Sequence, residues 1–125
     1  MKKSIVIILL ILILSNCTRS IPEYRKISAE EAHEMMSTLK DFILLDVRTE
    51  SEYSQKHISG AKPIPYDEIN ERAQAELPDK KAVILVYCAS GGRSGIAAKE
   101  LAAMGYVNVY DFGGIGGWPY ETVGD

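Results

Sequence analysis

Cysteine and histidine are scarce in this chain, with two of each among 125 residues. The two cysteines, Cys17 and Cys88, cannot form the set of several disulfides that holds many small secreted domains together, so a hydrophobic core must do so. The cysteines and histidines also lack the spacing of metal ligands. We therefore expect a single domain built around one core, with no metal ion and no other cofactor.

Basic residues are also fewer than acidic residues. Lysine and arginine number 14 against 17 acidic residues, which gives a formal net charge of −3. Binding of a nucleic acid backbone depends on many lysine and arginine contacts, and an acidic surface works against them. The composition therefore excludes nucleic acid as a main partner.

No apolar run in the chain has the length of about 20 residues that a membrane-spanning helix needs. The run at residues 5–14 is ten residues long, follows Lys2 and Lys3, and is typical of the core of a signal peptide. It ends in Leu14-Ser15-Asn16-Cys17, which resembles the signal of bacterial lipoproteins, where the leader is removed before a cysteine that is then lipidated.

This resemblance implies a signal peptide over residues 1–16, followed at 17–23 by a lipidated Cys17 and a short tether. The protein would then be exported and anchored to a membrane by the lipid on Cys17, facing the periplasm or the cell exterior. The alternative is an ordinary cleaved leader and a soluble periplasmic protein.

Strands and helices are predicted to alternate along the rest of the chain. Two capping boxes, at 28–31 and 49–52, each predict the start of a helix. Further helices are indicated by apolar side chains at helical spacing. Continuous apolar runs predict strands that are covered on both faces. The expected helices continue over 32–39, 69–77 and 97–104. The expected strands cover 42–47, 82–87 and 107–110, and 63–65 is expected to be a short strand or an extended turn. This order predicts an α/β domain with a largely parallel sheet, whose site lies beyond the carboxyl ends of the strands.

Cys88 comes at such a strand end, directly before a glycine-containing loop and a helix. Backbone N–H groups of a tight loop and the start of a helix favour the thiolate, which is the nucleophilic form of cysteine. Arg93 offers a guanidinium suited to an oxyanion, although it could instead pair with a surface carboxylate. We predict that Cys88 attacks a sulfane sulfur and becomes a persulfide. The substrate-binding residues are predicted to be Ala89, Ser90, Gly91, Gly92, Arg93 and Ser94.

Three segments in order resemble the motifs of rhodanese domains, the thiosulfate:cyanide sulfurtransferase family. These segments are the loop 88–93, an upstream signature at 45–48, 52–53 and 57–61, and the glycine–tryptophan ending at 113–118. The resemblance implies a rhodanese-like domain over residues 24–120, with a sheet of about five strands flanked by helices and a C-terminal tail at 121–125. It also implies a small sulfur-containing donor and a thiol or cyanide acceptor. Related domains often have arginine after the cysteine, so Ala89 implies weaker use of thiosulfate.

Two other functions remain open. One is a cysteine phosphatase or arsenate reductase of the related fold, but those enzymes have five residues between cysteine and arginine, and this chain has four. The other is a non-catalytic rhodanese module for binding or sensing. Asp46 and Arg48 are expected to form an ion pair or a hydrogen-bond network that supports the loop. His57 is expected to make a structural hydrogen bond, Trp118 to pack in the core or cover the sheet edge, and His33 to be a surface residue.

Overall fold

The computed structural model describes residues 23–124, so the predicted signal peptide and Cys17 lie outside the described residues. Strands and helices alternate as the sequence predicts. The elements are β1 (Arg25–Lys26), α2 (Ala29–Thr38), β2 (Ile43–Asp46), α3 (Glu50–Gln55), β3 (Lys56–His57), β4 (Lys62–Pro63), the 3-10 helix η1 (Tyr66–Glu68), α4 (Ile69–Glu76), β5 (Ile84–Cys88), α5 (Gly92–Ala103), β6 (Val109–Gly114), the 3-10 helix η2 (Ile115–Gly117) and β7 (Val123–Gly124).

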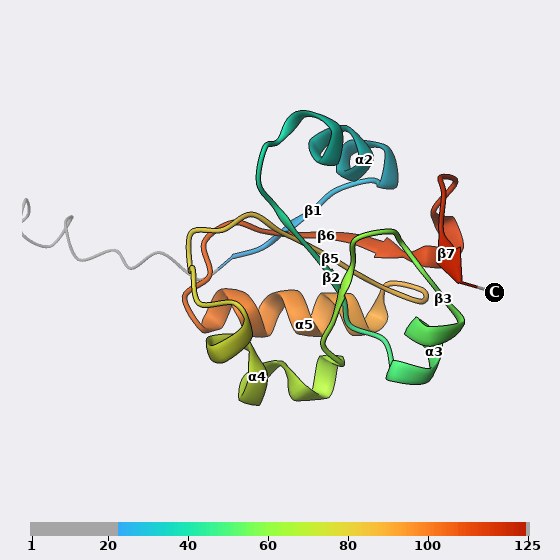
Figure 1. The fold of residues 1–125 in the computed structure, drawn as a ribbon. Coiled ribbons are helices and arrows are strands. Elements are labelled where there is room, and N and C mark those ends of the chain that lie inside the picture. Colours follow the sequence, from blue (N-terminus) through green and yellow to red (C-terminus); the bar gives the residue numbers. More distant parts are fainter. Residues whose placement is uncertain (1–22, 125) are drawn as a thin grey trace, which may run out of the picture.

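A parallel sheet of five strands, in the order β1-β6-β5-β2-β4, forms the middle of the domain. Helix α2 covers one face of this sheet, and α4 and α5 cover the other (Figure 1). The predicted α/β fold with a largely parallel sheet is therefore confirmed. The link between β5 and α5, together with α3 and β7, lies at one end of the sheet, where the site is expected.

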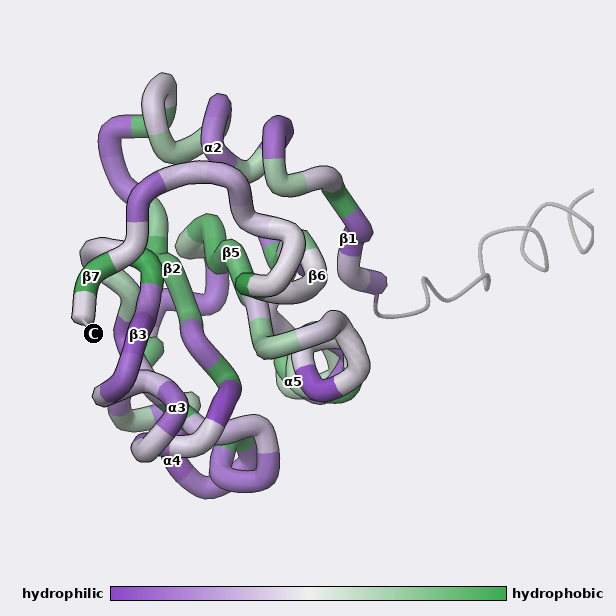
Figure 2. The backbone as a smooth tube through the Cα atoms, turned by 90° about the vertical axis from the view of Figure 1, so that its right-hand side faces the viewer, coloured by the Kyte–Doolittle hydropathy of each residue, from purple (hydrophilic) through white to green (hydrophobic). Residues whose placement is uncertain are grey.

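Each face of the sheet has its own hydrophobic core, because neighbouring side chains of a strand point to opposite faces. Along β5, Val86 and Cys88 pack on the side of α4 and α5, whereas Leu85 and Tyr87 pack on the side of α2. Strands β2 and β5 are the hydrophobic segments between these layers (Figure 2). All five residues of β5 are buried, which agrees with the continuous apolar run in the sequence.

Both predicted capping boxes are present. In α2, the Ser28 hydroxyl accepts a hydrogen bond from the N–H of Glu31, and the Glu31 carboxylate accepts one from the N–H of Ser28. Thr49 and Glu52 make the same reciprocal pair at the start of α3. These bonds satisfy N–H groups that the first turn of a helix otherwise leaves without a partner.

The last strand of the sheet differs from the sequence-based prediction. Strand β6 begins at Val109 and continues to Gly114, whereas the sequence predicted a strand over 107–110. Val107 is 64% exposed, so it does not belong to the buried run. The strand extends into the glycines because Gly114 pairs with Cys88 at the end of β5.

The C-terminal residues return to the domain. Val123 and Gly124 form β7, which pairs antiparallel with β3. The sequence predicted a tail at 121–125, because two-residue strands leave no periodic pattern. Within residues 23–124, no helix is both long and apolar enough to cross a membrane.

Candidate active site

Cys88 is the last residue of β5, and its side chain lies beneath the loop that leads into α5. The residue is only 1% exposed, and a bulge between Val86 and Cys88 disturbs the pairing of β5 with β6. Bulges redirect side chains at the ends of strands. The thiol is therefore held in a fixed position at the carboxyl edge of the sheet, as the sequence predicted.

The loop directs N–H groups at the sulfur. The N–H of Gly91 donates a hydrogen bond to Cys88 Sγ at 2.9 Å. Gly91 has a φ of +108°, a left-handed conformation that favours glycine and allows this tight turn. Burial raises the pKa of the Cys88 thiol, but hydrogen bonds from Ser94, Gly91 and Ser90 outweigh it, and the pKa is lowered overall. These bonds stabilise the thiolate.

Ser94 is the side chain that supports the thiol directly. It is fully buried in the first turn of α5, and its Oγ lies 3.4 Å from Cys88 Sγ. The Ser94 hydroxyl also reaches the carbonyl oxygens of Gly91 at 3.1 Å and Gly113 at 3.4 Å. A hydroxyl placed in this way donates to the sulfur once the thiol has lost its proton.

We expect Ser94→Ala to raise the pKa of Cys88, because the thiolate loses a hydrogen bond. Alkylation of the thiol by iodoacetamide at neutral pH should slow by about two- to tenfold, which corresponds to the free energy of one hydrogen bond. The measurement is the alkylation rate against pH, which rises with the thiolate fraction. Ser37→Ala, which removes an exposed hydroxyl from α2, should leave the profile unchanged. If the midpoint of the pH profile is the same in Ser94→Ala as in the wild type, Ser94 does not have this role.

The glycine-rich ending of β6 forms one wall of the loop. The N–H of Gly116 donates to the carbonyl oxygen of Ala89 at 3.3 Å. A Cβ on Gly114 would lie 2.2 Å from that same oxygen and 2.7 Å from the Cα of Ser90. Gly114 is therefore required for the loop to approach β6, a role that the sequence analysis did not assign.

Arg93 makes an ion pair across the site. Its Nη1 donates to Glu52 Oε1 at 2.7 Å and its Nη2 to Glu52 Oε2 at 3.0 Å. Both a substrate contact and a carboxylate partner were possible for Arg93 from the sequence, and the structure provides the carboxylate. Contact between Arg93 and a substrate stays a prediction. From the sequence, Glu52 belonged to a capping box and to the rhodanese-like signature, but its ion pair was not predicted because Arg93 is 41 positions away.

Asp46 and Arg48 form the predicted ion pair, and both are buried. Arg48 Nη2 lies 2.8 Å from Asp46 Oδ2 and also donates to the carbonyl oxygen of Lys56. Nearby, the Tyr87 hydroxyl accepts a hydrogen bond from the N–H of Ile58 at 3.0 Å. These contacts fix β3 and the following residues to the end of the sheet beside the Cys88 loop.

The other singled-out residues have structural contacts. His57 stacks on Tyr53, and its Nδ1 lies 2.8 Å from the Tyr53 carbonyl oxygen, which agrees with the predicted structural hydrogen bond. Trp118 is a core residue, as expected. His33 is exposed, as expected, and it stacks on Tyr120 with ring centroids 3.7 Å apart.

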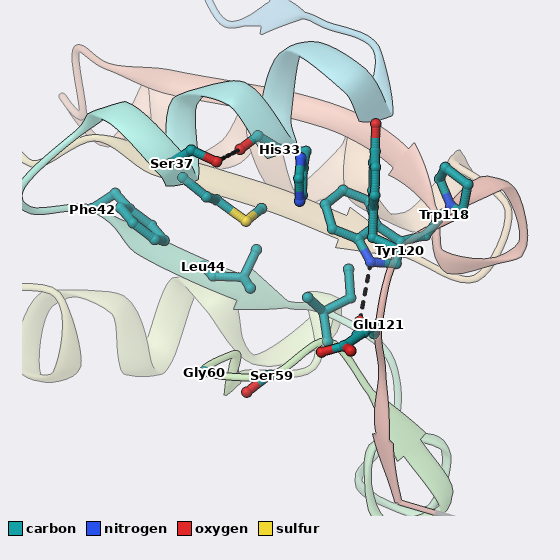
Figure 3. Close-up of a pocket in the computed structure, with 12 residues that line it drawn as sticks. His33, Ser37, Phe42, Leu44, Ser59, Gly60, Trp118, Tyr120 and Glu121 are labelled. Atoms are coloured by element: carbon teal, nitrogen blue, oxygen red, sulfur yellow. Dashed lines mark hydrogen bonds between the residues drawn. The ribbon is translucent and has the colours of Figure 1, made fainter.

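A cavity of about 860 Å³ lies on the α2 face of the domain. Figure 3 shows His33 and Ser37 of α2 on one side and Trp118, Tyr120 and Glu121 of the C-terminal segment on another. Its lining includes Leu44 and Ile58, which pack in the core on the α2 side, whereas Cys88 packs in the core on the opposite face. This cavity is therefore separate from the thiol.

Comparisons with known proteins agree with this arrangement. A family model described as "Rhodanese-like domain" matches residues 28–120. Thiosulfate sulfurtransferase PspE from Escherichia coli (strain K12) is 42% identical over 71 residues, which are 57% of this chain and 68% of that protein. Thiosulfate sulfurtransferase GlpE from Coxiella burnetii is 34% identical over 99 residues, which are 79% of this chain and 86% of that protein.

Solved structures show the same fold. A rhodanese with anions from E. coli has a TM-score of 0.64 and 36% identity, and the match covers 68% of this chain and 100% of that chain. The Alr3790 protein from Anabaena has a TM-score of 0.72 and 29% identity, with 78% and 91% covered. Both matches cover most of the domain, so the structural similarity is not limited to the Cys88 loop.

Proposed function

The chain belongs to the family of rhodanese-like domains, and on that premise we propose that it is an enzyme that transfers a sulfane sulfur through a persulfide on Cys88. The observation that carries the proposal is the environment of Cys88 Sγ, which accepts a hydrogen bond from the N–H of Gly91 and lies beside the Ser94 hydroxyl. A lowered thiol pKa increases the fraction of the thiol that is present as the nucleophilic thiolate. The relatives named thiosulfate sulfurtransferases support the same class of reaction.

The first half of the proposed reaction loads the sulfur. The Cys88 thiolate attacks the outer sulfur of a donor such as thiosulfate, a bond forms between the two sulfur atoms, and the S–S bond of the donor breaks. Sulfite leaves with the electron pair of the broken bond. The new terminal sulfur carries the negative charge, and the N–H groups of the loop stabilise it as they stabilise the thiolate.

The second half transfers the sulfur to an acceptor. A thiolate or cyanide attacks the terminal sulfur, and Cys88 leaves as a thiolate, ready for another cycle. Donor and acceptor therefore react in turn with the same residue, which predicts ping-pong kinetics. Because Cys88 is only 1% exposed, a narrow end of each substrate must reach the sulfur.

The proposal is tested by weighing the intact domain after it has been incubated with thiosulfate or mercaptopyruvate. We expect the mass of the protein to increase by one sulfur atom, and we expect cyanide or a thiol to reverse the increase. No added sulfur with any sulfane donor would overturn the proposal. Hydrolysis of an aryl phosphate that depends on Cys88 would favour the phosphatase alternative instead.

We also propose that the protein is exported and held at a membrane by a lipid on Cys17. The proposal is supported by Lys2 and Lys3, by the apolar run at 5–14 and by the position of Cys17 directly after the leader. Cys17 lies outside the described residues. The domain would then work close to the membrane, because the tether at 18–23 spans at most about 20 Å.

Labelling cells with a radioactive fatty acid tests the anchor. We expect the wild-type protein and Cys88→Ser to carry the label, and Cys17→Ser to lose it. If Cys17→Ser keeps the label, or if the wild-type protein is never labelled, the anchor proposal is wrong.

A further inference from the structure

The positive charge of the Cys88 loop comes from one side chain. Arg93 is the only residue of the segment 88–94 that carries a full positive charge. Its guanidinium makes two parallel hydrogen bonds to the Glu52 carboxylate, at 2.7 and 3.0 Å. The cation closest to Cys88 along the chain is therefore countered by an anion from α3.

Glu52 is itself held in place. Its Oε1 accepts hydrogen bonds from the N–H of Thr49 at 3.2 Å and from the Thr49 hydroxyl at 3.1 Å, in addition to the bond from Arg93. The capping box of α3 therefore also orients the carboxylate toward the loop. A side chain with three donors at one oxygen has little freedom to turn away.

The Glu52 carboxylate stays charged well below neutral pH. The hydrogen bond from Arg93 lowers the pKa of Glu52 to about 2. The same pair raises the pKa of Arg93, which also interacts electrostatically with Cys88 and Asp46. The pair thus adds almost no net charge to the site, and a bound anion is attracted mainly by N–H dipoles.

We propose that Glu52 determines donor specificity by cancelling the charge of Arg93, so that the site favours sulfane donors with one negative charge or none over dianions such as thiosulfate. This inference rests on the proposed sulfur transfer. Glu52 uses one N–H of each terminal nitrogen of Arg93, so other guanidinium N–H groups can still donate to a donor oxygen. The site recognises such an oxygen by hydrogen bonds and gains little from a second negative charge.

Two donors of nearly equal shape test this proposal. Thiosulfate is a dianion, and the methanethiosulfonate ion, CH3SO2S⁻, replaces one charged oxygen by a methyl group. In both reactions the Cys88 thiolate attacks the outer sulfur, and the donor S–S bond breaks. The electron pair leaves on sulfite or on methanesulfinate, so no oxidant or reductant is needed.

The variant to test is Glu52→Gln. Glutamine serves in a capping box as glutamate does, so the change removes the charge and keeps the start of α3. The matched control is Glu76→Gln, because Glu76 makes a similar pair with Arg72, at 2.6 and 3.1 Å, on α4. The control changes the net charge of the protein equally but far from the Cys88 loop in sequence.

We measure the second-order rate constant for loading of Cys88 by each donor, using intact mass against time. In Glu52→Gln, we expect the rate constant for thiosulfate to rise relative to that for methanethiosulfonate by about three- to tenfold. The reason is that the second negative charge of thiosulfate is attracted by the uncovered positive charge of Arg93 across several ångströms. Added salt should reduce this gain. Glu76→Gln should keep the wild-type ratio.

The pKa of Cys88 gives a second readout that structural damage would not imitate. Removing a nearby negative charge favours the thiolate, so Glu52→Gln should lower the pKa of Cys88 measured by iodoacetamide alkylation. Loss of loop structure would raise it instead. An unchanged donor ratio, or a raised pKa, overturns the role of Glu52. If neither donor loads the wild-type protein, sulfur transfer itself is wrong.

Discussion

Cys88→Ser is expected to take up no sulfur from any sulfane donor, with a loss of loading rate of more than about 10³-fold. The physical reason is the nucleophile: a serine hydroxyl is not ionised near neutral pH, and this loop offers it no general base, whereas the Cys88 thiol already has a lowered pKa. Intact mass after incubation with thiosulfate and with methanethiosulfonate measures the effect.

The fold of Cys88→Ser should be intact, because serine occupies nearly the same volume and Ser94 and Gly91 offer it hydrogen-bond partners. Thermal unfolding that matches the wild type within a few degrees serves as the control. A variant that still gained one sulfur would place the persulfide on another residue. The proposed reaction would then be wrong in its central step.

Gly114→Ala should reduce sulfur loading by about 100-fold or more, although residue 114 contributes no reactive side chain. The new Cβ would lie 2.2 Å from the carbonyl oxygen of Ala89, so the loop or β6 must move. Displacement of a reacting group by about 1 Å can cost 10²-fold in rate. The atoms that the new Cβ would meet belong to the backbone, so no flexible side chain can turn away to relieve the clash.

The matched control is Gly117→Ala, three residues further along. A Cβ on Gly117 would meet no atom within 4 Å, and Gly117 does not have a positive φ. We expect this control to load sulfur at the wild-type rate, and Gly114→Ala to be destabilised by about 1–3 kcal/mol as well. Equal loading by both variants would show that the loop tolerates the displacement.

Much of the fold was predictable because its signals are local. The apolar run that ends at Cys88 indicated the central strand, and the capping boxes at Ser28 and Thr49 marked the starts of α2 and α3. Each of these signals depends on residues within a few positions of one another. The order of strands and helices then followed from their alternation.

The short strands were not predictable in the same way. Strands β1, β3 and β7 contain two residues each, too few for an alternating pattern to appear. They are strands only because a partner lies beside them: β1 pairs with β6, and β3 pairs with β7. The end of β6 was missed for the same reason, since Gly113 and Gly114 favour a turn until the pairing with β5 is known.

The sequence by itself determined the proposed nucleophile and its immediate surroundings. Cys88 and the loop through Ser94 are contiguous, so the glycines, the hydroxyls and the four-residue spacing to Arg93 follow from the order of residues alone. The preference for sulfur chemistry over phosphate chemistry rests on that spacing. The lowered pKa of Cys88 agrees with the sequence-based expectation of a thiolate.

Only the tertiary structure decided the charge and the walls of the site. Glu52 lies 41 residues from Arg93, and Gly114 lies on the neighbouring strand, so neither contact follows from local spacing. The parallel sheet brings these segments to one edge, because the carboxyl ends of its strands meet there. The chain order thus places the Cys88 thiol in its loop, and the packing of distant segments places the Glu52 carboxylate against Arg93 and so sets the charge beside that loop.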